Sequence, residues 1–318
     1  WGKDLMTKVI MDCDPGIDDA IALTVLLAHP EKADLIGVTT VGGNVQLDYV
    51  TQNAQKLLTF LGSHAELAAG QATPLVKEIQ TASHVHGKTG MDGYDFPENS
   101  LDYPIKSHNA VTYMYNKIIN SDEKINLVAT APLTNVALLL KTFPDVKENI
   151  EHIYIMGGST LQGNITLAAE FNAYVDPEAM DIVFNSGLPI TLSGLNLTEN
   201  KAYVTMDEIS KIKDLGHVGV MASSILDIYA GHESSIGMTK IPIHDACAVI
   251  SLIAPELFTK STNYSMDVSL TNDQYRGMTY PDRRVDSEKK NSIKVLEDVD
   301  REAFVKFIFD SIASYDKK

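Results

Sequence analysis

The chain has 318 residues, of which 44% are hydrophobic and 21% charged, a balance typical of globular proteins. Its formal net charge is −16, which argues against binding to nucleic acids or anionic membranes, because proteins that bind them need basic patches. The two cysteines, Cys13 and Cys247, are too few for a disulfide framework and form no zinc pattern. We therefore expect a cytoplasmic protein that binds neither nucleic acid nor membrane.

Short apolar segments alternate with helical patterns along the first part of the chain. This alternation predicts βαβ crossovers and an α/β fold with one open, mostly parallel sheet and helices on both faces. The strands expected are KVIMD (8–12), DLIGVTTV (34–41), INLVATA (125–131), HIYIMGG (152–158) and LPITLSG (188–194), with helices ending near residue 29, spanning about 48–61, and following Pro132.

The remaining segments complete this picture. Residues 70–109 are rich in Gly, Pro, Asp and Ser and too long for a plain connection, so we expect a functional or mobile loop. YSMDVSL (264–270) can turn back onto GMTY (277–280) as a small antiparallel hairpin. A last helix places Phe304, Ile308, Ile312 and Tyr315 on one face. We find no internal repeat or linker, which favours a single domain over residues 1–318.

The start of the chain lacks the apolar core of a signal peptide. Residues 1–5, WGKDL, are expected to be a non-native leader ahead of a native Met6. The longest apolar stretches are too short and interrupted to cross a bilayer.

Four aspartates crowd the junction between the first predicted strand and its helix: Asp12, Asp14, Asp18 and Asp19, inside the run DCDPGIDDA. Asp14 followed by Pro15 predicts a helix N-cap with proline at the first helical position. Acids at a helix start gain about 0.3–1 kcal/mol each from the dipole, which explains one or two of them but not four. Because ligands bind at this edge of a parallel sheet, these oxygen donors predict a hard cation, Ca²⁺ or Mg²⁺.

Other chemistries compete for parts of the pattern. A strand ending in D-x-D also resembles the nucleophile loop of haloacid-dehalogenase-like phosphatases, but Pro15 and Gly16 depart from the DxDGT-like run of that family. GKTG (87–90) suggests a phosphate-binding P-loop, yet Ala82 occupies the position of its first glycine. The two cysteines flank acidic residues and could join a histidine in nucleophilic catalysis, although buried cysteines are more often packing.

Six segments, in order along the chain, are similar to the motifs of one family. They are DCDPGIDDA, TTVGGN (39–44), VHGKTG (85–90), ATAPLTN (129–135), the run from IMGGS to DPEA (155–179), and IHDACAV (243–249). Together they resemble the inosine/uridine-type nucleoside hydrolases. The resemblance implies the nucleoside hydrolase fold and an enzyme that hydrolyses the N-glycosidic bond of ribonucleosides to free base and ribose, in nucleoside salvage.

Carried onto this chain residue by residue, the resemblance implies a Ca²⁺ site. Its ligands would be Asp14, Asp19, Asp245 and the backbone carbonyl of Thr130. Asp14 would also be the general base that takes a proton from a metal-bound water, and Asp12 would support the ligands from behind. The residues implied in ribose binding are Asp18, Asn44, Asn164, Glu170 and Asn172, with Met156 lining the sugar site.

On the base side, the resemblance implies His244 as the general acid, with His86 close by. The segment 223–240, which would close over the base, matches the family less well. Its candidates are Tyr229 and His232, and His232 could either donate a proton to the base or face solvent. Purine or pyrimidine preference therefore stays open, and the family implies a homodimer or homotetramer.

The chemistry suits such a site. N-glycoside hydrolysis passes through an oxocarbenium-like cation, as in other glycoside hydrolysis, and carboxylates around the sugar stabilise this charge. Buried polar groups around the ribose should favour ribosides over deoxyribosides. A non-catalytic metal and ribose binder on the same fold is the alternative. The pair Asp14 and His244 favours the enzyme, because a binder needs no acid and base.

Overall fold

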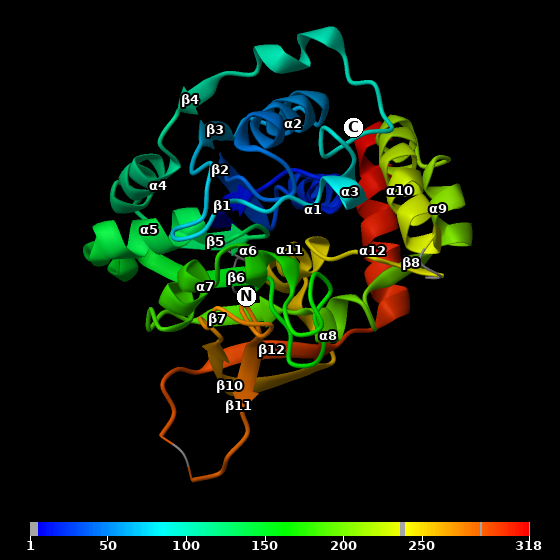
Figure 1. Cartoon of the computed structure of the whole chain (residues 1–318). Helices are drawn as coiled ribbons and strands as arrows, with labels where there is room; N and C mark the ends of the chain where they lie inside the picture. Colours follow the sequence, from blue (N-terminus) through cyan, green and yellow to red (C-terminus); the bar gives the residue numbers. More distant parts are fainter. Residues whose placement is uncertain (1–5, 236–238, 287, 318) are drawn as a thin grey trace, which may run out of the picture.

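The computed structural model describes residues 6–235, 239–286 and 288–317, and a sheet of ten strands forms its centre (Figure 1). The strand order is β11-β10-β12-β7-β6-β5-β1-β2-β3-β4. Neighbours from β12 to β4 pair in parallel, whereas β10 runs antiparallel to both β12 and β11. The strands are β1 (Thr7–Cys13), β2 (Ala33–Thr40), β3 (Glu66–Ala69), β4 (Ile105–Ser107), β5 (Ile125–Ala129), β6 (Ile150–Met156), β7 (Ile190–Ser193), β10 (Lys260–Val268), β11 (Thr279–Asp282) and β12 (Ile293–Asp298), and a separate antiparallel pair is β8 (Tyr203–Thr205) with β9 (Lys240–Pro242).

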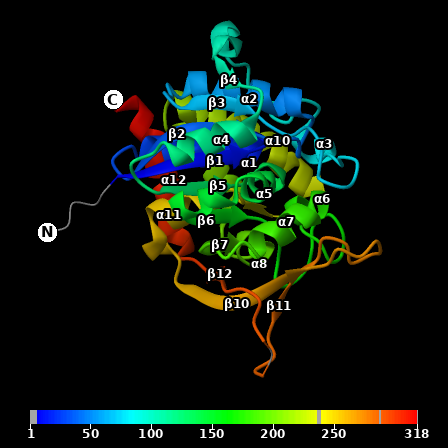
Figure 2. The same ribbon diagram turned by 90° about the vertical axis from the view of Figure 1, so that its left-hand side faces the viewer.

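Helices cover both faces of the sheet because successive side chains of the central strand point in opposite directions. Val9 and Met11 of β1 enter an apolar cluster with α1, α2, α10, α11 and α12, whereas Ile10 enters a second cluster with α4, α5 and α7. Figure 2 looks onto the side that carries α4 and α5. The helices are α1 (Ile17–Ala28), α2 (Leu47–Phe60), α3 (Ser83–His86), α4 (Ala110–Ile119), α5 (Thr134–Thr142), α6 (Phe171–Val175), α7 (Pro177–Phe184), α8 (Leu195–Thr198), α9 (Met206–Ile212), α10 (His217–Ser235), α11 (Ala246–Ile253) and α12 (Arg301–Ala313).

The predicted α/β fold class is confirmed. The expected strands correspond to β1, β2, β5, β6 and β7, and the expected hairpin to β10 and β11. Phe304, Ile308 and Ile312 of α12 are buried, and the Tyr315 hydroxyl donates to the carbonyl oxygen of Thr24 over 2.8 Å. Among the described residues, no helix is long and apolar enough to span a membrane. Residues 1–5, the expected leader, lie outside the described residues.

The predicted start of the first helix is wrong by two residues. Helix α1 begins at Ile17 with Gly16 as its N-cap, so Asp14 is not the cap. The Asp19 carboxylate, at the third helical position, accepts the backbone N–H of Gly16 over 3.2 Å. The Asp14 carboxylate instead accepts the backbone N–H of Asn44, which follows β2. A partner from another strand therefore outcompetes the local capping interaction.

The carboxyl ends of four neighbouring strands meet at one edge of the sheet. Asp14 follows β1, Asn44 follows β2, Thr130 follows β5, and Met156 ends β6. The segment 70–109 is hydrogen-bonded to the loop that follows β2; it holds α3 and then passes over α2 to β4 (Figure 1). The fold thus gathers the polar residues that lie far apart in the sequence.

Candidate active site

A pocket at this edge brings most of the predicted site residues together. Asp14 and Asp19 are hydrogen-bonded to two of its lining residues, Asn44 and Thr130. The side chains of His86 and His232 lie outside the described part of the structure. The lining residues are Asp18, Asn44, Thr130, Met156, Asn164, Glu170, Phe171, Asn172, Tyr229, His244 and Asp245.

Asp14 is held by Asn44 in one orientation. Its Oδ2 accepts the Asn44 backbone N–H over 2.6 Å, and its carbonyl oxygen accepts Asn44 Nδ2 over 3.0 Å. The other carboxylate oxygen, Oδ1, is buried and has no hydrogen-bond partner. A β-carbon at Gly43 would lie 2.0 Å from Asp14 Oδ2, so the backbone after β2 can approach this carboxylate only as glycine.

Three further carboxylates converge beside Asp14. Ligand oxygens of Asp18, Asp19 and Asp245 lie within 4.8 Å of one another, and all three side chains are buried. The Thr130 hydroxyl donates to Asp19 Oδ1 over 2.7 Å, and Asp18 Oδ1 has no partner. Asp245 stands at the N-cap of α11, where the helix dipole favours negative charge. The structure therefore places Asp18, predicted to contact ribose, within the carboxylate cluster.

Burial and mutual repulsion strongly perturb these acids. Burial, followed by the charge of Asp18, raises the pKa of Asp19 to about 8. Burial also raises the pKa of Asp14 and of Asp245 well above the ordinary value, with neighbouring aspartates adding to the effect. Among the described residues, no lysine or arginine forms an ion pair with this cluster. Buried acidic oxygens without a cationic partner fit a hard divalent metal ion.

In the pocket wall, Glu170 organises the loop between β6 and α6. As the N-cap of α6, it accepts the backbone N–H groups of Asn172 over 2.9 Å and Ala173 over 3.1 Å. It also accepts the N–H of Gly158 over 2.7 Å. Burial raises the pKa of Glu170 to about 7 despite these three donors. A carboxylate is thereby fixed in the pocket wall.

Two asparagines support the same wall. Asn172 Nδ2 donates to the carbonyl oxygens of Thr130 over 2.9 Å and Met156 over 3.2 Å, and so ties α6 to the ends of β5 and β6. The Thr130 carbonyl predicted as a metal ligand therefore already accepts one hydrogen bond, with a second lone pair remaining. Asn164 Oδ1 accepts the N–H of Phe171 over 2.9 Å, which holds the long loop in place.

His244 and Tyr229 also line the pocket. His244 is 8% exposed, and its Nδ1 lies 2.7 Å from the Thr198 hydroxyl oxygen, which orients the ring. Tyr229, on α10, is 5% exposed. His244 and Asp245 are adjacent in sequence, and both line the same pocket, where Asp245 belongs to the carboxylate cluster.

Asp12 is buried and does not line the pocket. Its Oδ1 accepts the Thr39 hydroxyl over 2.6 Å and Asn135 Nδ2 over 2.8 Å. Burial raises its pKa to about 6. Asn135 also donates to the carbonyl oxygen of Thr40 and accepts the N–H of Gln71. Asn135 thus connects the ends of β1, β2 and β3. The sequence did not predict this role, although Asn135 is the last residue of the motif ATAPLTN.

Both cysteines are free and buried, and burial raises the pKa of each thiol. Cys13 Sγ lies 3.7 Å from the Thr39 carbonyl oxygen, and Cys247 Sγ lies 3.3 Å from that of Ile243. These thiols hold their protons, so the environment opposes a cysteine nucleophile.

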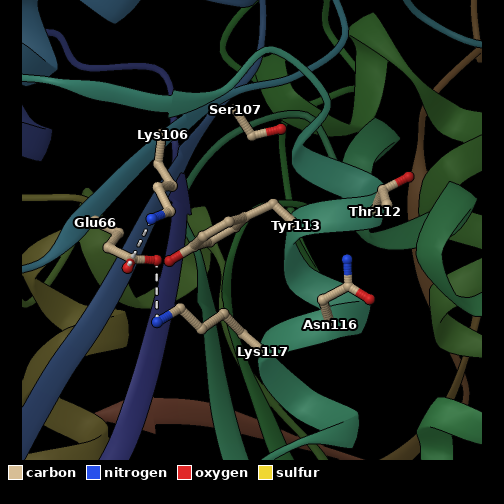
Figure 3. Close-up of a pocket in the computed structure, with 7 residues that line it drawn as sticks. All are labelled: Glu66, Lys106, Ser107, Thr112, Tyr113, Asn116 and Lys117. Carbon is tan, nitrogen blue, oxygen red and sulfur yellow. Dashed lines mark ion pairs between the residues drawn. The ribbon is translucent and has the colours of Figure 1, made fainter.

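A larger hollow of 360 Å³ lies at the far sheet edge, between β3, β4 and α4 (Figure 3). The amino groups of Lys106 and Lys117 point toward Glu66 there, at 3.9 and 3.0 Å. Its charged groups thus partner one another, and it contains none of the predicted site residues. The strand-end pocket of 70 Å³, with its unpaired acids, is the better candidate for chemistry.

The family model described as inosine-uridine preferring nucleoside hydrolase matches residues 9–306. The chain belongs to this family. It is therefore a nucleoside N-ribohydrolase, an enzyme that hydrolyses the N-glycosidic bond of ribonucleosides. The match extends from Val9, the third residue of the central strand β1, into helix α12, so it covers every element that contributes to the pocket.

Individual nucleoside hydrolases agree with this assignment. The pyrimidine-specific ribonucleoside hydrolase RihA of Shewanella sp. (strain ANA-3) is 40% identical over 311 residues, covering 96% of each chain. The RihA of Citrobacter koseri is 38% identical, covering 96% of this chain and 98% of that protein. Thus the similarity extends over nearly the full length of both relatives.

Solved structures show the same fold. A plant nucleoside hydrolase, the PpNRh1 enzyme, has a TM-score of 0.87 at 31% identity and covers 96% of this chain and 99% of its own. The purine-preferring ribonucleoside hydrolase from Gardnerella vaginalis has a TM-score of 0.88 at 28% identity, covering 98% and 99%. These values bear out the nucleoside hydrolase fold expected from the six motifs.

Proposed function

We propose that this nucleoside hydrolase uses Ca²⁺ and Asp14 to direct water onto the ribose carbon of a ribonucleoside, with a preference for pyrimidine nucleosides. The observation that carries the proposal is the unpartnered Oδ1 of Asp14, buried beside a cluster of three carboxylates. A buried acceptor without a donor is costly in a protein that binds nothing there. It is useful where water and a substrate supply the missing donors.

The donor set supports calcium. Asp14, Asp19, Asp245 and the Thr130 carbonyl would hold the ion, and Asp18 is close enough to contribute. Calcium prefers six to eight oxygen ligands, of which flexible carboxylates supply most. When bound, the ion neutralises the carboxylates and lowers the pKa of water beside it. The raised pKa values of the aspartates then fall, because the charged forms gain a partner.

Asp14 serves as the general base. Oδ2 accepts the Asn44 N–H and keeps a second lone pair that could bind the ion, so we assign the proton from the attacking water to Oδ1, which has no partner. The hydrogen bond to Asn44 fixes the plane of the carboxylate, so the general base is already oriented before the reaction begins.

The sugar wall stabilises the developing cation. Three backbone N–H donors hold the Glu170 carboxyl group in the pocket wall, and Asp18 Oδ1, which is buried without a partner, can accept a ribose hydroxyl. Such fixed negative charges favour an oxocarbenium-like transition state over the neutral nucleoside. The further side chains we assign to the ribose are Asn44, Asn164, Asn172 and Met156.

The departing base needs a proton or a hydrogen bond. His244, oriented by Thr198, is our candidate for the general acid. We retain His86 and His232 as base-side residues on the family resemblance. Tyr229 lines the pocket on this side and joins them as a further contact with the base.

Pyrimidine preference rests on the relatives. The RihA proteins, named pyrimidine-specific, are 38–40% identical, whereas the purine-preferring enzyme from Gardnerella vaginalis is 28% identical. We also propose a role in nucleoside salvage, a homodimer or homotetramer, and a cytoplasmic location, in which the two free cysteines would stay reduced.

Release of reducing sugar from uridine, cytidine, inosine and adenosine by calcium-loaded protein tests the proposal. We expect the protein to release ribose, and to release it faster from uridine and cytidine than from inosine and adenosine. Faster cleavage of the purine nucleosides would overturn the pyrimidine preference. Absence of ribose from all four would overturn the function, and phosphate release from phosphomonoesters would then point to the phosphatase alternative.

A further inference from the structure

The run GKTGMDG, residues 87–93, forms a closed turn packed against helix α10. Asp92 closes it: Oδ1 accepts the Thr89 hydroxyl over 2.5 Å, and Oδ2 accepts the Lys88 backbone N–H over 3.1 Å. A β-carbon at Gly93 would lie 2.8 Å from the Ser224 carbonyl oxygen of α10. The turn that suggested a phosphate-binding loop is thus closed by its own side chains and packed against α10.

Asn53 connects this turn to the acidic loop. The residue lies on α2 and is 1% exposed. Its Nδ2 donates to the carbonyl oxygen of Pro15 over 3.0 Å and to that of Thr89 over 2.7 Å. One buried amide group therefore bridges the residue after Asp14 and the turn that follows α3.

The other end of α3 is also tied to the site. The backbone N–H of Ala82, which precedes α3, donates to the carbonyl oxygen of Asn44 over 2.9 Å. The short helix in which His86 stands is consequently held at both ends, by Asn44 before it and by Asn53 after it. A four-residue helix has little stability of its own, so its position depends on such ties.

We infer that Asn53 is a positioning residue of the nucleoside site: it holds residues 82–93 against the acidic loop. The catalytic meaning of this inference rests on the proposed function. The carbonyl oxygens of Pro15 and Thr89 need two N–H donors, and the amide group of Asn53 supplies both. An aspartate at this position has no N–H donor, and its negative charge would be buried beside the same two oxygens. When Asn53 is replaced, the acidic loop still has the hydrogen bonds from Asn44 to Asp14. The substitution should therefore loosen chiefly the turn of residues 87–93.

The test compares Asn53→Asp with Asn126→Asp in the full calcium-loaded chain. Asn126 is a control of similar burial and the same substitution: it is 5% exposed, lies near the amino end of β5, and donates to the Thr7 hydroxyl over 2.5 Å. Hydrogen–deuterium exchange reports on the amides of residues 82–93, and kinetics give kcat/KM for uridine and the inhibition constant of free ribose. If Asn53→Asp fails to fold, Asn53→Ser carries the same test without the charge.

For Asn53→Asp we expect faster exchange confined to residues 82–93 and a fall in kcat/KM of about ten- to a hundredfold, since small misplacements of reacting groups have effects of this size. The ribose inhibition constant and all control values should stay near those of the unaltered protein. Unchanged exchange, or freed exchange with unchanged kcat/KM, would overturn the inference. If the unaltered protein releases no ribose, the proposed function fails, while the exchange data still decide whether Asn53 holds the turn.

Discussion

Asp14 and Asn44 are joined by a 2.6 Å hydrogen bond from the Asn44 backbone N–H to Asp14 Oδ2, which determines the oxygen left for chemistry. Oδ1 remains buried without a partner. The bond depends on Gly43, since any side chain there would collide with the same carboxylate. Gly43 therefore permits the contact that orients the Asp14 carboxylate.

Asp14→Asn should abolish most of the turnover and leave the fold intact. The amide keeps the size of the side chain but cannot accept a proton, so we expect kcat to fall by about 10²–10⁴, the usual contribution of a general base. Ribose release from uridine and circular dichroism spectra measure the two effects. Turnover close to that of the unaltered protein would contradict the role of Asp14.

Metal-free protein should lose stability as the pH rises through the range in which Asp19 ionises. The folded-state pKa of Asp19 is about 8, above the ordinary value of 3.8, so the folded state binds the extra proton. The stabilisation is complete below pH 4 and is lost as the pH approaches 8. Asp19→Asn, which needs no proton, should therefore gain in Tm relative to the unaltered protein over this range. A pH-independent difference in Tm would contradict the assignment.

Calcium should reverse this trend. Binding requires ionised carboxylates, so the Tm increase caused by calcium should grow between pH 5 and 8 in the unaltered protein. Differential scanning fluorimetry at several pH values, with and without calcium, measures the effect. Asp245→Asn, which removes one acid of the cluster, should show a much smaller increase.

Ribose hydroxyls should determine substrate choice. A deoxynucleoside leaves acceptors such as Asp18 Oδ1 unpaired in the pocket. We expect kcat/KM for uridine to exceed that for 2′-deoxyuridine or 3′-deoxyuridine by about 10⁴, as for sites built to bind a substrate hydroxyl. Comparable rates for all three nucleosides would show that the sugar wall does not recognise the hydroxyls.

His244→Ala should slow the reaction only where the leaving group needs a proton. We expect a loss of about 10²–10⁴ in kcat with uridine. With p-nitrophenyl riboside, whose phenolate departs without protonation, the loss should be small. An equal loss with both substrates would indicate that His244 binds or orients the sugar.

Much of the fold could be predicted because strand–helix alternation is local. The β10–β11 hairpin and the buried face of α12 were also readable from alternation and helical spacing. Strands β3 and β4 were not, because each is short and lies inside or beside the irregular segment 70–109. The start of α1 was misplaced because Asp14 exchanges its local capping role for a bond to Asn44.

The residues of the site could be predicted mainly from the sequence motifs. Acidic residues close in sequence predicted a cation site, and the resemblance connected them to Glu170, Asn172 and His244 far along the chain. Joints such as Asn53 and Asn135 were not foreseen, because their partners, among them Thr89 and Gln71, approach only in the folded chain. A buried asparagine in a helix carries no local sign of such a bond.

Uridine cleavage by protein stripped of metal, then restored with calcium, tests the central claim most directly. Chromatography should show uracil and ribose in equal amounts after calcium is added, and little of either product before. Under the same conditions Asp14→Asn should yield far less product than the unaltered protein. Cleavage at full rate without calcium, or undiminished by Asp14→Asn, would contradict the account.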